Sequence, residues 1–131
     1  MIGLDTIVLV RYIMQDDPRQ ATKASTLVES LTPTEPGFVT LVTVVELFWV
    51  LTASYDLSRV QVVTLFDALM RTKQLLVEQA DQVLRALRVY GAGSADFPDC
   101  LIERTARAAG CHKVRTFDVG ASRQAAMTLI G

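Results

Sequence analysis

The sequence predicts an α/β fold in which a parallel sheet is covered by helices on both faces. Short apolar stretches alternate with longer segments of helical periodicity, the pattern of strands joined by helical crossovers. The 131 residues are 50% hydrophobic and 21% charged, which is typical of a globular domain with a substantial core. No internal repeat or linker interrupts them, so residues 1–131 are expected to form a single domain.

The first half of the chain contains two of the predicted strands. Residues 2–5 are expected to form a short buried strand, followed by a helix at 6–15. Asp17 and Pro18 have the residue types of an N-cap and a first helical residue, so a second helix is predicted up to residue 31. After a loop at 32–37, residues 38–40 are a predicted strand. Residues 42–54 are too long for a strand and are predicted to be a buried helix.

The second half continues the alternation. Ser58 is the expected N-cap of a helix ending near residue 71, residues 75–77 are the third strand, and residues 79–90 are a helix that the 91–94 segment ends. Another helix begins at residue 96 or 97 and is closed by Gly110. Residues 113–117 are the fourth predicted strand, and 128–130 are a possible fifth.

Composition and charge narrow the class of protein. No apolar run reaches the roughly 18 residues of a membrane span, and the N-terminus lacks signal-peptide features, so a cytoplasmic protein without membrane contact is expected. Cys100 and Cys111 have no zinc-binding spacing and are expected to be reduced and packed. The net charge is −1. Without the five acids considered next, nine acids remain against thirteen bases, a net of +4 that suits a phosphate backbone approaching an acidic cleft.

Five acidic residues lie at positions that the predicted strands and helices would bring close together. The five are Asp5, Glu46, Asp96, Asp99 and Asp118. In open parallel sheets, ligands bind beyond the carboxyl ends of the strands, where Asp5 and Asp118 fall. Carboxylates in apolar settings cost free energy unless they are paired or bind a cation, and hard oxygen ligands favour Mg²⁺ or Mn²⁺. The chemistry that follows is metal-assisted attack on a phosphate.

Each acid also has a purely structural interpretation. Asp5 and Asp96 could be helix N-caps, with Asp99 an ordinary first-turn acid. Glu46 lies within an apolar run and could pair with an arginine, and Asp118 could be a turn residue. Thr116 could orient a carboxylate or a metal-bound water, or be an ordinary strand threonine. Two aromatic residues, Phe48 and Trp49, are expected in the core, and the one histidine, His112, in an exposed loop.

The segments that contain these acids resemble those of the PIN-domain nucleases, and most closely the VapC toxins of bacterial VapBC toxin–antitoxin pairs. The segments are Met-Ile-Gly-Leu-Asp5-Thr6, Val45-Glu46-Leu47, Ala95-Asp96-Phe97-Pro98-Asp99 and Thr116-Phe117-Asp118. Arg11-Tyr12, Gln15-Asp16-Asp17-Pro18 and residues 106–111 are also similar. The resemblance covers nearly the whole chain, and the order and spacing of the motifs are its specific part.

The resemblance implies a three-layer α/β/α fold with a central parallel sheet of four to five strands. It implies a Mg²⁺- or Mn²⁺-dependent endoribonuclease that cuts structured RNA, such as tRNA or rRNA, to arrest translation. It also implies a VapB-type antitoxin partner and a homodimer. Asp5, Glu46, Asp99 and Asp118 correspond to the catalytic quartet, of which Asp5, Asp99 and Asp118 together with Asp96 would hold the metal. Thr6, Ile7 and Thr116 would contact these ligands without binding the metal themselves.

One position departs from the family pattern. Ile7 stands where a polar Asn or Ser is usual, and its side chain cannot hydrogen-bond a ligand carboxylate or a metal-bound water. Such a loss typically costs about 10–100-fold in metal affinity or activity. A catalytically weak PIN-fold protein that binds an antitoxin is therefore the alternative. A phosphohydrolase with Asp5 as nucleophile is disfavoured, because Ile7 stands where its second aspartate belongs.

Overall fold

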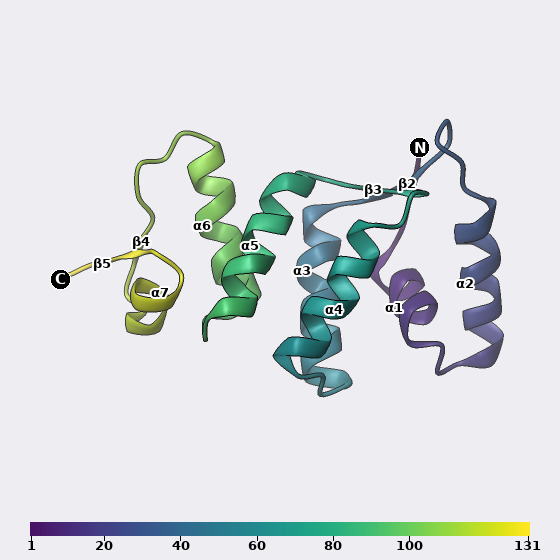
Figure 1. The fold of residues 1–131 in the computed structure, drawn as a ribbon, viewed down its shortest axis with the longest axis horizontal. Helices are drawn as coiled ribbons and strands as arrows, with labels where there is room; N and C mark the ends of the chain where they lie inside the picture. The colour runs from purple at the N-terminus through teal and green to yellow at the C-terminus, as the bar shows by residue number, and fades with distance from the viewer. The chain divides into compact units, whose positions relative to one another are not determined.

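The computed structural model describes all of residues 1–131, which fold into two compact units, Met1–Glu78 and Gln79–Gly131. Each unit contains helices and parallel strands (Figure 1). The predicted α/β class with parallel strands is confirmed. The predicted sheet of four to five strands is matched only roughly, because the five strands divide into a sheet of three and a sheet of two. No helix combines the length and the apolar character that crossing a membrane requires.

The first unit is built on a parallel sheet in the order β1–β2–β3. Its strands are β1 (Ile2–Gly3), β2 (Gly37–Val39) and β3 (Leu75–Val77). Gly37 of β2 pairs with Ile2 on one side and with Leu75 on the other. A Cβ atom at Gly37 would lie 2.8 Å from a methyl group of Leu4, so a larger residue would require the surrounding leucine side chains to shift.

Helical segments connect these strands. The first crossover consists of α1 (Thr6–Met14) and α2 (Pro18–Ser30); the second consists of α3 (Leu41–Trp49), a π-helix (Val50–Ser54) and α4 (Arg59–Met70). Asp17 caps α2 with Pro18 in its first turn, as predicted. Ser58 caps α4 in a reciprocal capping box with Gln61. These two helix starts could be predicted because each depends only on residues within one turn of the helix end.

The predicted helix at residues 42–54 needs two corrections. It is α3 followed by the π-helix Val50–Ser54, which changes the direction of the later side chains. Trp49, expected in the core, is 49% exposed, and its ring meets the buried Phe48 edge to face. Glu46 is also exposed, because the buried face of α3 is formed by Thr43, Val44, Leu47 and Phe48. Glu46 therefore does not bear the desolvation cost that the apolar run suggested.

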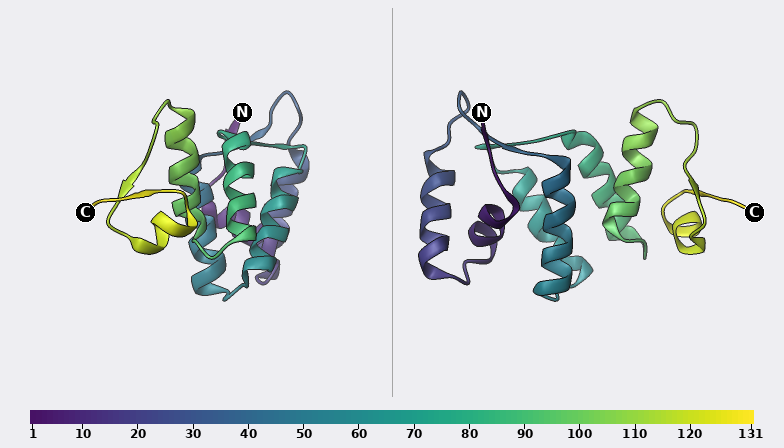
Figure 2. Two further views of the ribbon diagram at one scale, coloured as in Figure 1. Left: turned by 60° about the vertical axis from the view of Figure 1, so that its left-hand side comes forward. Right: turned by 180° about the vertical axis from the view of Figure 1, so that it is seen from behind.

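The second unit contains three helices and two short strands. They are α5 (Ala80–Ala92), α6 (Phe97–Ala108), β4 (Arg115–Thr116), α7 (Val119–Gln124) and β5 (Thr128–Leu129), with β4 and β5 parallel (Figure 2). Helices α5 and α6 run side by side, and the rings of Tyr90 and Phe97 meet edge to face. Gly110 has a φ of 101° just beyond α6, which explains why a glycine ends it.

Two predictions for this unit are wrong, and one helix was not predicted. Helix α5 does not stop at residue 90 but continues through Gly91 to Ala92, since glycine is tolerated in a last turn. Helix α7 was not predicted at all, because its six residues are too few to show a period. Cys111 is exposed in the turn after α6, whereas Cys100 is buried as expected; both thiols are free. His112 is exposed in a loop, as predicted.

Candidate functional site

In the first unit, Asp5, Thr6 and Glu46 form a continuous chain of contacts. Asp5 is the N-cap of α1, and its Oδ1 accepts a hydrogen bond from the backbone N–H of Thr6 at 2.8 Å. The buried Thr6 hydroxyl donates to Oε1 of Glu46 at 3.0 Å. The start of α1 is thereby linked to the outer face of α3. The partner of Glu46 is this threonine, not the arginine considered above.

Ile7 lies next to this chain of contacts and is 47% exposed. Its side chain lines an apolar pocket of about 300 Å³ between α1 and α2, together with Val8, Ala24 and Leu27. Ile7 therefore contributes apolar surface to the groove between α1 and α2. Its neighbour Thr6 supplies the hydroxyl that contacts Glu46.

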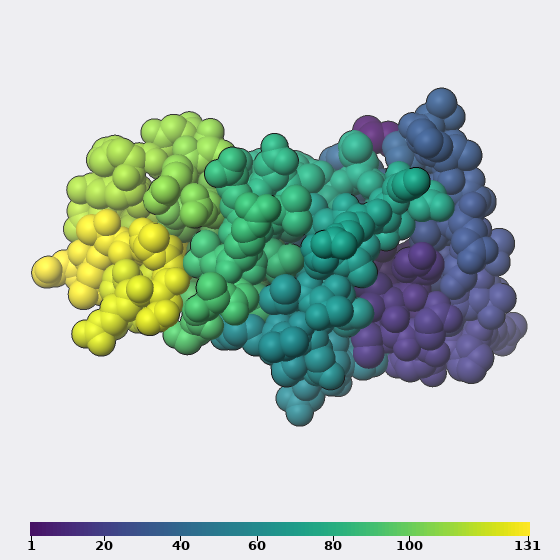
Figure 3. Space-filling model, in the orientation of Figure 1, coloured from purple at the N-terminus to yellow at the C-terminus, as the bar shows by residue number.

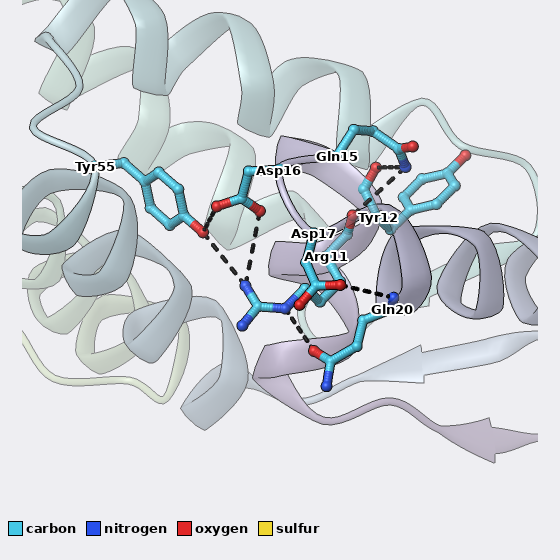
Figure 4. A network of polar contacts seen from close by, with 7 residues as sticks. All are labelled: Arg11, Tyr12, Gln15, Asp16, Asp17, Gln20 and Tyr55. Atoms are coloured by element: carbon cyan, nitrogen blue, oxygen red, sulfur yellow. Dashed lines mark hydrogen bonds and ion pairs between the residues drawn. The ribbon is translucent and has the colours of Figure 1, made fainter.

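The other end of α1 is held by a polar network around Arg11 (Figure 4). Arg11 Nε donates to Gln20 at 2.6 Å, and Arg11 Nη1 lies 3.7 Å from Asp16. The Tyr55 hydroxyl donates to Asp16 at 2.7 Å, which lowers the pKa of the Asp16 carboxyl and raises that of Tyr55. These contacts tie the end of α1 to α2 and to the segment after the π-helix. They stabilise the helix whose first turn contains Asp5 and Thr6.

In the second unit, Asp96, Asp99 and Asp118 lie near one another at the starts of two helices. Asp96 is the N-cap of α6, and its Oδ1 accepts from the N–H of Asp99 at 2.8 Å. Asp118 is the N-cap of α7 rather than a simple turn residue, and its Oδ1 accepts from the N–H of Ala121 at 3.1 Å. Thr116 accepts a hydrogen bond from the N–H of Asp118, which fixes the turn between β4 and α7.

The Asp99 carboxyl lies in an electrostatically unfavourable environment. Burial raises the pKa of the Asp99 carboxyl, and the negative charges of Asp96 and Asp118 raise it further. The ion pairs Arg11–Asp16, Arg71–Asp67 and Arg107–Glu103 involve none of these three aspartates, and no basic residue lowers the pKa of the Asp99 carboxyl. Asp99 is thus a half-buried carboxylate in a locally negative environment.

This donor set suits a hard divalent cation. Within each unit, no group of three or more His, Cys, Asp or Glu side chains is arranged closely enough to hold a metal ion as it stands. The negative charges of Asp96 and Asp118 nevertheless repel that of Asp99, and a cation with oxygen ligands removes that repulsion. Mg²⁺ binds through few carboxylates and keeps several waters, so the residues present fit such an ion.

Sequence reasoning missed Phe117, which precedes Asp118 and is 80% exposed. Arg115, two residues earlier and on the same side of an extended chain, is also exposed. The signal was available in the sequence: an aromatic residue directly before a candidate ligand at the end of a strand.

The sequence profile of the PIN domain matches residues 2–126, which is nearly the whole chain. No curated protein and no solved structure gives a significant match.

Proposed function

The chain belongs to the PIN domain family, whose members are generally metal-dependent nucleases, and from this premise we propose that it is an endoribonuclease toxin of the VapC type. Its substrate is structured RNA, such as tRNA or rRNA, and its cleavage arrests translation. A VapB-type antitoxin binds and neutralises it. The protein acts as a homodimer in which residues 1–131 form one PIN domain.

The observation that carries this proposal is the uncompensated charge around Asp99. A half-buried carboxylate that is repelled by Asp96 and Asp118 is costly in the free protein, and a bound cation would remove that cost. Asp5, Glu46, Asp99 and Asp118 are assigned as the catalytic acids. Asp5, Asp96, Asp99 and Asp118 are assigned as residues that hold Mg²⁺ or Mn²⁺, directly or through water.

Residues of the protein itself position the proposed catalytic acids. The side chains of Asp5 and Asp118 are held by hydrogen bonds as the N-caps of α1 and α7, and Asp99 lies in the first turn of α6. Thr6 fixes Glu46, and Thr116 fixes the turn that contains Asp118. A bound divalent cation supplies an activated water and stabilises charge on the phosphate.

The distribution of basic residues supports a nucleic-acid substrate. Residues 100–131 contain five bases and two acids, a net charge of +3 in a chain whose total is −1. Lys113, Arg115 and Arg123 in this segment are exposed. Basic side chains close to an acidic site attract a phosphate backbone toward it.

The proposal is tested by incubating the antitoxin-free protein with total bacterial RNA in Mg²⁺, Mn²⁺ or EDTA. Discrete fragments that require metal are expected, and end mapping identifies the target. Asp5→Asn is expected to abolish cleavage, and because asparagine is also a good N-cap, α1 stays intact. Asp81→Asn, an exposed acid in the first turn of α5, is the matched control and should cleave normally. Full activity of Asp5→Asn would disprove the site.

Ile7 sets the expected strength of this activity. Exchange of the usual polar residue for isoleucine predicts weak catalysis, and Ile7→Asn should cleave faster than the parent, by up to about 10–100-fold. Equal rates would show that Ile7 serves packing in the α1–α2 groove and does not limit the chemistry. Absence of cleavage by either protein would favour an interaction protein that binds an antitoxin without turnover.

A further inference from the structure

The second unit contains a polar pocket of about 90 Å³ that the proposed chemistry does not use. Its walls come from the second half of α6, the loop after it, and the start of β5. The lining residues are Glu103, Arg107, Cys111, His112, Lys113, Val114, Ala126 and Thr128. The space-filling view shows the C-terminal segment, in yellow, lying against the yellow-green segment that precedes it in the chain (Figure 3).

Glu103 is the unusual member of this lining. The residue is only 5% exposed, and one carboxylate oxygen pairs with Arg107 one turn later. The other oxygen, Oε2, is buried and has no hydrogen-bond partner. Leaving a buried charged acceptor unsatisfied is costly, so Oε2 calls for a donor from outside the chain.

The rest of the pocket is basic. The Arg107 side chain is 60% exposed, and Lys113 and His112 are exposed. A ligand that fits must therefore offer a hydrogen-bond donor to Glu103 and negative charge to Arg107 and Lys113. Phosphate diesters alone provide only the negative charge.

A ribonucleotide provides both groups. We propose that this pocket is a ribose–phosphate subsite for the RNA strand, in which the 2′-hydroxyl donates to Glu103 Oε2 and the neighbouring phosphate contacts Arg107 and Lys113. The proposal rests on the ribonuclease function above and names the feature by which the protein selects RNA over DNA, since only RNA has this hydroxyl. Arg107 would have to leave its ion pair with Glu103 to admit the sugar, and its side chain, which is 60% exposed, has room to turn outward toward the phosphate.

The position of the pocket along α6 fits a strand that also reaches the acidic cluster. Asp99, Glu103 and Arg107 follow one another at intervals of four residues, so they lie on one side of the helix. Each interval rises about 6 Å along the helix axis. A strand whose phosphate lies at Asp99 therefore passes Glu103 and Arg107 within a nucleotide or two.

The test measures binding in EDTA, where no metal-dependent cleavage occurs, by fluorescence anisotropy. Three labelled single strands of one sequence are compared: RNA, DNA, and RNA with every 2′-hydroxyl methylated, which cannot donate. The protein is expected to bind RNA about tenfold more tightly than either of the others, which corresponds to one hydrogen bond to a charged acceptor. Equal affinity for the three strands would overturn the proposal.

Two variants locate the effect. Glu103→Met keeps the length of the side chain without its oxygens and should abolish the preference for RNA. The readout is the ratio of RNA affinity to DNA affinity, because loss of the negative charge strengthens the binding of both strands alike. Lys113→Ala should weaken RNA and DNA equally and reduce the salt slope by about 0.7. Lys73→Ala, an exposed lysine in the first unit, is the control that should keep both the slope and the ratio.

The outcomes separate the two proposals. An unchanged RNA to DNA ratio in Glu103→Met means that water satisfies Oε2, and the subsite is wrong even if the protein cleaves RNA. If Glu103→Met does not fold, the methylated strand and Lys113→Ala decide, since neither perturbs the core. A preference for RNA that depends on this pocket, in a protein that cleaves nothing with Mg²⁺ or Mn²⁺, would support the subsite and remove the nuclease assignment.

Discussion

The hydroxyl of Thr6 donates a hydrogen bond to Oε1 of Glu46 at 3.0 Å, although forty residues separate them in the chain. Thr6 is the first residue of α1, and its own N–H is held by Asp5. A rotation of Thr6 would therefore disturb two of the proposed catalytic acids together. Glu46 itself is exposed, and without this bond its side chain would sample many rotamers.

Thr6→Val is expected to slow RNA cleavage by about 10–100-fold, because it removes the group that orients Glu46 while preserving shape. The Mg²⁺ concentration for half-maximal cleavage should rise, and the melting temperature should change little. Thr6→Ser, which keeps the hydroxyl, should cleave like the parent. If Thr6→Val also cleaves like the parent, the orientation of Glu46 does not matter for the reaction.

Two variants of Asp96 distinguish its role as the N-cap of α6 from its proposed role in metal binding. Asp96→Ala removes the N-cap of α6 and should cost about 1 kcal/mol in the free energy of unfolding, measured by urea titration. Asp96→Asn keeps the cap and removes a charge that repels Asp99, so its stability without metal should equal or exceed that of the parent. Its cleavage should nevertheless fall, since one metal-holding oxygen is weakened. A stable and fully active Asp96→Asn would leave Asp96 with the cap alone.

Features encoded within a few residues were predictable from the sequence. The caps at Asp17, Ser58 and Asp96, the strand Leu75–Val77, and the helix end at Gly110 all follow from local backbone chemistry. The family was also recognisable from the order and spacing of the acidic motifs, and the PIN domain profile matches residues 2–126. The assignment of individual acids to the reaction stays a prediction.

Features that depend on distant contacts were not predictable. The burial of α3 depends on which of its faces meets the core, so the apolar neighbours of Glu46 misled the prediction. The helix after Asp118 is six residues long, and its cap residue looked like a turn. The partner of Glu46 could not be inferred, because a contact across forty residues leaves no local pattern.

The Tyr55–Asp16 hydrogen bond predicts a specific pH dependence of stability. Because the folded-state pKa of Asp16 is lowered, its contribution is present above its usual value of 3.8 and is lost as the pH falls through the lower folded value. Because the pKa of Tyr55 is raised from 10.0, its contribution is present below 10.0 and is lost as the pH rises through the folded value. Tyr55→Phe should therefore melt at a lower temperature than the parent at pH 5–8, with the difference shrinking in acid and in strong base.

The control for this pH profile is Tyr12→Phe, because the hydroxyl of Tyr12 takes no part in the network of Figure 4. Thermal melts of the three proteins across pH give the comparison. A Tyr55→Phe difference that is constant from pH 2 to pH 8 would mean that the hydroxyl acts through packing and not through the Asp16 carboxylate.

Phe117 is expected to provide a stacking surface for a base next to the cleaved phosphate. It is 80% exposed and directly precedes Asp118, and base–aromatic stacking contributes about 1–3 kcal/mol per base. Phe117→Ala should weaken RNA binding in EDTA by about tenfold and leave the unfolding free energy within about 0.5 kcal/mol, since little buried surface is lost. Phe117→Trp should restore binding, and Val60→Ala, at an apolar residue 76% exposed in the first unit, should bind like the parent. If Phe117→Ala binds RNA normally but sediments as a smaller species, Phe117 belongs instead to an interface between two copies of the chain.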